Sequence, residues 1–203
     1  RGFSGGRWCG WSSPWSSILA PVELLDVLAR RRSVRRFKPV PIPEEDLEKL
    51  LFALQRAPTD ASAQLYSAIR VRDPRLRDEV ARLSGDQEHI RQAAEFFLFL
   101  ADVHRLERLL AHRGQRMAFW PRTALHFAIL DAGIAASYLA LTAEALGYGV
   151  CFIGGVLNGV EALTDLLGLP PGVLPVVGLA VGVPAEEGPP RPRLPRRLVV
   201  HED

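Results

Sequence analysis

A long apolar stretch in the second half of the chain limits the possible folds more than any other feature. Over residues 122–146 the apolar side chains cover most of the circumference of a helix, so more than one side of that helix needs a covering layer. Asp131 and Glu144 interrupt the stretch, and a lipid-facing span would bury their charges at high cost. We therefore expect a core helix and no membrane span. A partner subunit is expected to cover the sides that the remaining short elements cannot.

The other periodic segments alternate between helical and extended patterns. Helical spacing of apolar residues predicts further helices over residues 22–29, 44–57, 76–83, 105–113 and 159–167. Alternating or continuous apolar runs predict strands over residues 68–72, 95–100, 150–153 and 174–183. Loops are expected over residues 59–64 and 184–195, and an extended tail through residues 198–200. Without repeats, and with few strands, the pattern predicts an α+β protein with long helices on one modest sheet.

The length and the charge of the chain narrow its class. Its 203 residues suffice for a single domain with its own core, which we expect over residues 18–203. Residues 1–17, rich in Trp, Gly and Ser, are expected to be a flexible tail or a segment foreign to the natural protein. The 25 basic and 23 acidic residues nearly cancel, which disfavours nucleic acid or an anionic membrane as a partner.

The cysteines and histidines exclude several kinds of site. Cys9 and Cys151 cannot build a disulfide framework, so a reducing cytoplasm is the expected location. No Cys/His cluster has the spacing of metal ligands, and no metal site is expected. Cys151 lies in an apolar strand segment, where a structural role is favoured over a catalytic one.

Two arginine-rich segments, residues 31–36 and residues 191–193, are the main candidates for binding chemistry. Several guanidinium groups and a hydroxyl at one helix-to-loop junction suit a phosphate monoester, and a solvated surface is the alternative for each segment alone. The pair Gly154-Gly155 after a strand can present backbone N–H groups to a ligand or form a plain turn. The glycine-rich motifs of Rossmann and P-loop sites are absent from the sequence.

Five short segments, taken in order, make the chain resemble a known family. They resemble the flavin-contacting segments of the nitroreductase family, in particular its oxygen-insensitive NADPH nitroreductases and FMN-dependent flavin reductases, and the likeness runs over residues 22–203. Their order and near-constant spacing carry the resemblance more than any single motif. The segments are Arg31-Arg32-Ser33-Val34-Arg35, Thr59-Asp60-Ala61-Ser62-Ala63-Gln64, Gly85-Asp86-Gln87-Glu88-His89, Phe152-Ile153-Gly154-Gly155 and Arg191-Pro192-Arg193-Leu194-Pro195.

The resemblance implies a nitroreductase-like fold, with a mixed, mostly antiparallel sheet and an FMN site in a cleft of a homodimer. The residues it implies at the FMN phosphate are Arg31, Arg32, Ser33, Arg35, Arg191 and Arg193. The residues it implies around the rest of the flavin are Thr59, Asp60, Gln64, Gln87, Phe152, Ile153, Gly154 and Gly155. No separate catalytic residue is implied, because the flavin itself supplies the redox chemistry.

The activity implied by the resemblance is an FMN-dependent oxidoreductase that takes two electrons from NADPH or NADH. It would pass them to nitroaromatics, quinones or flavins in a ping-pong cycle. Other flavin tasks on the same fold (reductive dehalogenation, azoline oxidation, flavin cleavage) stay open as alternatives, as does a non-catalytic flavin-binding module. The relatives resembled continue past the position of Asp203 with a segment that supplies cations for the NADPH phosphate, so we expect a weak preference between the two nicotinamides.

Overall fold

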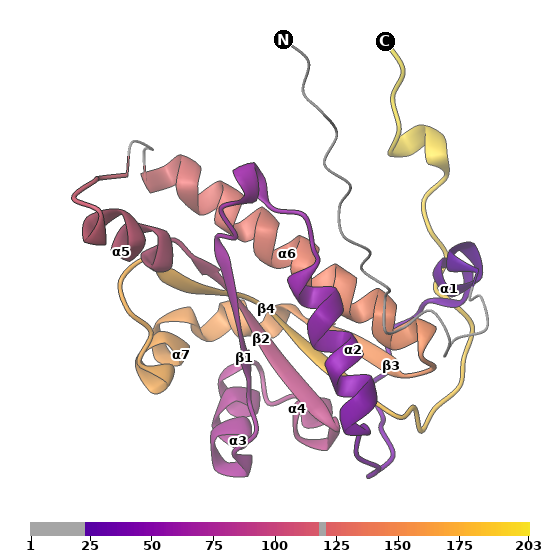
Figure 1. The fold of residues 1–203 in the computed structure, drawn as a ribbon. Helices are drawn as coiled ribbons and strands as arrows, with labels where there is room; N and C mark the ends of the chain where they lie inside the picture. The colour runs from indigo at the N-terminus through magenta and orange to yellow at the C-terminus, as the bar shows by residue number, and fades with distance from the viewer. Residues whose placement is uncertain (1–22, 118–120) are drawn as a thin grey trace.

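The computed structural model describes residues 23–117 and 121–203 of the chain. Within this part, seven α-helices surround one four-stranded sheet, which confirms the predicted α+β class (Figure 1). Helices α2 and α6 cover one face of the sheet, and α3, α4 and α7 cover the other. The predicted tail over residues 1–17, and Cys9 within it, lie outside the described residues.

The sheet has the strand order β1-β2-β4-β3, and each pair of neighbouring strands is antiparallel. The strands are β1 (Tyr66–Arg70), β2 (Glu95–Asp102), β3 (Gly149–Ile153) and β4 (Val173–Gly182). An isolated bridge between Ser33 and Val150 adds a parallel element, so the predicted mixed, mostly antiparallel sheet is confirmed. Because β3 is an edge strand, its outer side is available to the segment that carries Ser33.

Strand β2 forms the centre of the molecule and is buried along its whole length, as its continuous apolar sequence predicts. Successive side chains of a strand point to opposite faces, so Phe97 and Phe99 lie in the core beneath α2 and α6. Phe96 and Leu98 lie in the opposite core, together with residues of α3, α4 and α7. The two cores hold the sheet between two helical layers.

Six of the seven helices coincide with the segments where apolar spacing predicts them. The helices are α1 (Leu24–Arg30), α2 (Glu44–Gln55), α3 (Pro74–Leu83), α4 (Glu88–Gln92), α5 (His104–His112), α6 (Pro121–Ala145) and α7 (Val160–Leu167). Helix α2 has three acidic residues in its first turn, where they interact favourably with the helix dipole. Helix α4 has too few residues to show an apolar period, so the sequence does not predict it.

Helix α6 packs on the sheet through one face and presents a second apolar face to solvent. Its buried face consists mainly of alanines, which allow a close approach to β2 and β4. The opposite face exposes four large side chains: Ile129, Leu130, Ile134 and Tyr138. By length and composition residues 123–145 could cross a membrane. An 18-residue window of this segment has a mean hydropathy of 1.6, but 44% of that window is buried inside the fold. The structure therefore has the predicted core helix, and one side of that helix is uncovered.

Several element boundaries differ from the sequence-based expectations by one or two residues, and two expected loop or tail segments contain short 3-10 helices. The strand expected over residues 68–72 is β1, which begins two residues earlier, at Tyr66. The loop over residues 59–64 contains a short 3-10 helix, η1 (Asp60–Ser62). The extended tail expected through residues 198–200 is wrong, since a 3-10 turn, η3 (Arg196–Leu198), precedes it and the Val200 N–H bonds back to the Arg196 carbonyl. These apolar residues are exposed and have no strand beside them, so the backbone bonds locally.

Candidate functional site

The two arginine-rich segments, far apart in sequence, line one small cavity of about 210 Å³. We call it the arginine cavity. All six residues predicted for a phosphate lie in its wall, together with two glutamates. Its lining consists of Arg31, Arg32, Ser33, Arg35, Glu186, Glu187, Gly188, Pro189, Arg191 and Arg193. With five arginines against two carboxylates, the cavity favours an anion.

Backbone pairing brings the two segments together. The Lys38 N–H donates to the Val183 carbonyl at 2.8 Å, and the Ala185 N–H donates to the Arg36 carbonyl at 2.8 Å. These bonds extend β4 by a short antiparallel ladder beyond the end of the strand. The ladder sets the loop after α1 against the loop after β4, which is why their arginines meet.

Glu186 joins the same two segments through its side chain and its carbonyl. One carboxylate oxygen accepts from the Arg35 N–H at 2.5 Å, and the other accepts from Arg36 Nε at 3.1 Å. The Glu186 carbonyl accepts from the Arg32 guanidinium at 2.6 Å. The hydrogen bond from the Arg35 backbone, followed by those from Arg36, lowers the pKa of Glu186 below its usual value, so this residue is a carboxylate at neutral pH.

The first segment also lies along the edge strand β3. The Val34 N–H donates to the Val150 carbonyl at 2.9 Å, next to the bridge formed by Ser33. A side chain at Gly149 would overlap Val34, with atoms 2.8 Å from the added carbon, so glycine is required for this approach. The arginine cavity therefore lies at the start of β3.

The other end of β3 holds a second group of predicted residues. A side chain at Gly155 would clash with the Ser84 carbonyl and with the Gln87 side chain, so these residues touch the Gly155 backbone. The Gln87 side-chain amide donates to the Ser84 carbonyl at 2.7 Å. Strand geometry separates Val150 from Gly154 by about 13 Å. A ligand that reaches from the arginine cavity to Gln87 must therefore be elongated.

The third predicted group, the loop over residues 59–64, is held by a buried carboxylate of α6. Asp131, 1% exposed, accepts from the Asp60 N–H at 2.9 Å and from the Leu65 N–H at 3.0 Å. Within the loop the Gln64 N–H donates to Thr59 Oγ1 at 3.3 Å. Asp131 thus fixes both ends of the loop to the helix.

This loop has an unusual backbone. Ala61, Ser62 and Gln64 have φ values of 46°, 56° and 53°, a left-handed conformation that residues other than glycine adopt at a cost of about 1 kcal/mol or more each. Arg105 stabilises it by donating to the Gln64 carbonyl at 2.5 Å and to the Tyr66 carbonyl at 2.6 Å. Such strain, over-determined by neighbouring contacts, is typical of binding loops.

Within one chain this loop lies beside the middle of α6, and the arginine cavity lies near the C-terminal end of that helix. The loop is bound to Asp131, whereas Glu144, thirteen positions further along the helix, lies beside Arg31 and Arg32. At 1.5 Å per residue, those two helical positions are about 20 Å apart. The structure therefore brings together the predicted residues of the first and second groups along β3, and places Thr59, Asp60 and Gln64 elsewhere.

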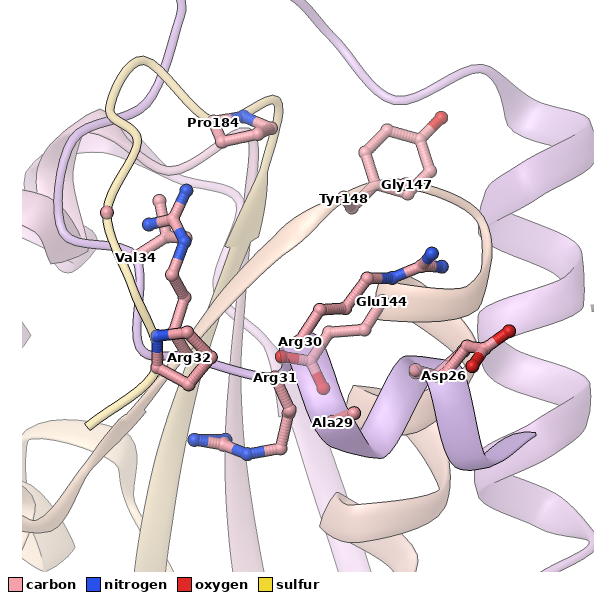
Figure 2. Close-up of a pocket in the computed structure, with 13 residues that line it drawn as sticks. Asp26, Ala29, Arg30, Arg31, Arg32, Val34, Glu144, Gly147, Tyr148 and Pro184 are labelled. Carbon is pink, nitrogen blue, oxygen red and sulfur yellow. The ribbon is translucent and has the colours of Figure 1, made fainter. Parts of the chain in front are cut away.

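A larger cavity of about 550 Å³ adjoins the arginine cavity and shares Arg31 and Arg32 with it (Figure 2). Glu144 of α6 faces the end of α1 in this cavity and accepts a hydrogen bond from the Arg32 backbone, while its other oxygen is buried without a partner. Burial raises the pKa of Glu144 to about 7, against the opposing charges of Arg31 and Arg30. Glu144 thus changes its charge near neutral pH.

Two further groups lie close enough to the arginine cavity to sense its charge. Burial raises the pKa of the Cys151 thiol, and the arginine charges only partly oppose this effect, so little thiolate forms and the structural role fits. Burial and the charge of Arg35 lower the pKa of His89, which is 8% exposed and neutral near pH 7. Neither group supplies a nucleophile.

The fold and the site define a class: an α+β protein whose antiparallel sheet has an arginine-lined anion cavity at the start of its edge strand. More particularly, the chain belongs to the Nitroreductase family, whose profile matches residues 28–183.

Individual relatives agree with this assignment. The chain is 34% identical over 181 residues to the FMN reductase (NADPH) of Bacillus subtilis (strain 168), covering 88% of this chain and 73% of that protein. It is 35% identical over 179 residues to the oxygen-insensitive NADPH nitroreductase of Salmonella typhimurium, with the same two coverages. The NADPH:FMN oxidoreductase from Vibrio harveyi, solved in complex with NAD+, superposes with a TM-score of 0.83 at 32% identity and covers 89% of this chain and 76% of its own.

The sequence did not point to Asp131, Glu144 and Glu186 as parts of the site. In the sequence, Asp131 and Glu144 served only as evidence that the apolar helix does not face lipid. A lone carboxylate on a helix that must pack on several sides signals a buried acceptor, because an unpaired charge there is costly. No comparable signal marks Glu186, which is one of several charged residues in a loop rich in proline and glycine.

Proposed function

We propose that this protein is an FMN-dependent NAD(P)H oxidoreductase that reduces small acceptors such as nitroaromatics, quinones or flavins. The observation that carries the proposal is the arginine cavity, where two segments about 150 positions apart in sequence meet around a space of phosphate-binding character. Relatives named FMN reductase (NADPH), oxygen-insensitive NADPH nitroreductase and NADPH:FMN oxidoreductase support the same activity.

The residues of the cavity suit the terminal phosphate of FMN. Arginine forks pair with phosphate oxygens through charge-assisted hydrogen bonds, and Arg31, Arg32, Arg35, Arg191 and Arg193 all line the space. A cavity of about 210 Å³ has room for one terminal phosphate, whereas FAD would have to place a second phosphate and an adenosine beyond it, so the cavity favours FMN over FAD. Bound there, FMN supplies the two-electron chemistry, while the protein supplies orientation and electrostatics.

The remainder of the flavin would follow β3 toward its far end. The distance of about 13 Å between the cavity end of the strand and Gly154 suits an extended ribityl chain with a ring beyond it. At that end Gly155 lets the backbone approach the Ser84 carbonyl and Gln87, and Phe152 exposes 37% of its surface on the same strand. These groups would orient the ring.

A homodimer completes this site in our proposal. The exposed apolar face of α6 and the exposed Leu24 and Leu25 of α1 leave an apolar surface that a second copy would bury. A two-fold arrangement can also place the strained loop over residues 59–64 of the partner subunit against the flavin, whereas the loop of the same chain lies about 20 Å along α6 from the arginine cavity. Sedimentation equilibrium tests this assembly: a monomer that still binds FMN would contradict it.

The spectrum of the purified protein decides the function. A yellow protein with flavin absorbance that bleaches anaerobically on addition of NADPH or NADH, and regains its colour with a quinone or nitroaromatic, is the enzyme proposed. A yellow protein that does not bleach with either nicotinamide is a flavin-binding module without this activity. A colourless protein that fails to take up added FMN would refute the proposal entirely. The cytoplasmic location stays a prediction.

A further inference from the structure

The arginine cavity contains two carboxylates, Glu186 and Glu187, which is unexpected for a site that takes an anion. A negative charge in the wall repels a bound phosphate, so each carboxylate weakens binding unless it also does something useful. The two residues differ in this respect. Glu187 is exposed and makes no hydrogen bond within the part of the chain that the structure describes, whereas Glu186 accepts from three donors of the opposite segment.

The contacts of Glu186 continue the ladder between the two arginine-rich segments. The last backbone rung joins the Ala185 N–H to the Arg36 carbonyl, and the next N–H toward the cavity, that of Arg35, has the Glu186 carboxylate as its acceptor. A side chain therefore replaces a backbone carbonyl at the point where the segments diverge around the cavity. The Glu186 carbonyl adds a bond from the Arg32 guanidinium, which directs that side chain along the cavity wall.

The charge of Glu186 is offset outside the cavity. Its second oxygen accepts from Arg36, whose side chain is 73% exposed and does not line the cavity. The carboxylate is thus balanced by an arginine that the phosphate does not use. By contrast, among the described residues Arg193 donates only to the carbonyls of Arg191 and Pro192 in its own loop, so its side chain does not tie that loop to the first segment.

We infer that Glu186 is a positioning residue, which holds the two arginine-bearing segments together so that both can grip the phosphate of FMN. The inference rests on the proposed function, because it assumes that FMN occupies the cavity. Its carboxylate acts through the Arg35 backbone and the Arg36 side chain, its carbonyl holds Arg32, and no contact between Glu186 and the ligand is required.

The test compares three variants by titrating flavin-free protein with FMN and with riboflavin, following flavin fluorescence. Glu186→Ala removes the carboxylate contacts with Arg35 and Arg36 and one negative charge, and it keeps the backbone carbonyl that accepts from Arg32. Glu187→Ala removes one negative charge alone, and Glu186→Gln keeps an acceptor oxygen without the charge. Riboflavin has the same ring and ribityl chain but no phosphate, so it reports damage outside the cavity. Thermal unfolding of each variant checks that the fold is intact.

We expect Glu186→Ala to raise the Kd for FMN about tenfold while the Kd for riboflavin stays within about twofold. Glu187→Ala should bind FMN as well as the unaltered protein or severalfold more tightly. Glu186→Gln should restore most of the lost affinity. This pattern separates positioning from charge, since charge alone would make every variant bind FMN more tightly.

Other outcomes overturn the inference. Equal or tighter FMN binding by Glu186→Ala would mean that Glu186 only occupies the cavity as a substitute anion. Equal losses for FMN and riboflavin would mean general damage and no specific role at the phosphate. If the unaltered protein binds riboflavin and FMN equally or binds neither, the proposed phosphate site itself is wrong, and the inference falls with it.

Discussion

Replacing Asp131 by alanine tests a deeply buried polar contact between α6 and the loop over residues 59–64. Asp131 accepts from the N–H groups of Leu65 and Asp60, and its removal leaves both without this acceptor. Leu65 is buried, so its unpaired N–H costs about 2 to 3 kcal/mol, while the half-buried Asp60 regains water and costs about 1 kcal/mol. We therefore expect Asp131→Ala to lower the free energy of unfolding by about 3 to 4 kcal/mol, a large share of the usual total for a domain.

Urea unfolding followed by circular dichroism measures this change, with the slope unchanged and the midpoint lowered. Ser137→Ala is the matched control on the same helix, because within the described residues the exposed Ser137 hydroxyl bonds only to the Gly133 carbonyl one turn earlier. The control should change the free energy of unfolding by less than about 0.5 kcal/mol. A loss below about 1 kcal/mol for Asp131→Ala would refute the view that this carboxylate holds the strained loop.

Three further predictions address the cavities and the turn after β3. Arg32→Ala should weaken FMN binding about tenfold to a hundredfold, from the loss of a charge-assisted contact of about 1.5 to 3 kcal/mol, and unchanged affinity by fluorescence titration would contradict its place at the phosphate. Glu144 has its pKa raised from 4.5 to about 7, so the folded state holds its proton more tightly and the contribution of Glu144 to stability is lost as pH rises from about 4.5 through 7. Relative to the unaltered protein, Glu144→Gln should therefore gain about 1 to 2 kcal/mol, allowing for partial solvation, between unfolding measurements at pH 4.5 and pH 8; a pH-independent difference is the contrary result. Gly155→Ala should lower stability by about 1 to 3 kcal/mol because its side chain meets the Ser84 carbonyl, whereas Gly154→Ala, with open space around it, should not; equal melting temperatures for the two variants would show that the close approach is unimportant.

The sequence alone determined most of the secondary structure, because its signals are local. Each pattern predicts which side of its segment must be buried. Examples are the acidic first turn and apolar stripe of α2, the unbroken apolar run of β2 and the apolar residues around most of α6. The same signals fail where a segment is short. Helix α4 has five residues, and the apolar end of the chain has no strand beside it, so neither could be read from period alone.

The family resemblance also came from sequence, through the order of five segments, and it named the residues that later lined the arginine cavity. Sequence order could not say which of those segments meet. The cavity residues and Gln87 lie along β3, whereas the loop that contains Thr59 is attached near the middle of α6, about 20 Å along the helix from the cavity. The distance between the loop and the cavity follows from the length of α6 and the direction in which it packs on the sheet. A short sequence motif carries no information on either.

Only the tertiary structure decided the roles of the acidic residues. Asp131, Glu144 and Glu186 are all acidic residues, and the sequence does not distinguish their roles. In the structure Asp131 is a buried acceptor for a strained loop, Glu144 has a pKa near neutrality and Glu186 joins two arginine-rich segments. Their differences arise from burial and from donors located roughly 65 to 150 positions away in the chain. Charge and hydrogen bonding depend on neighbours in space, and those neighbours exist only once the sheet and its two helical layers have formed.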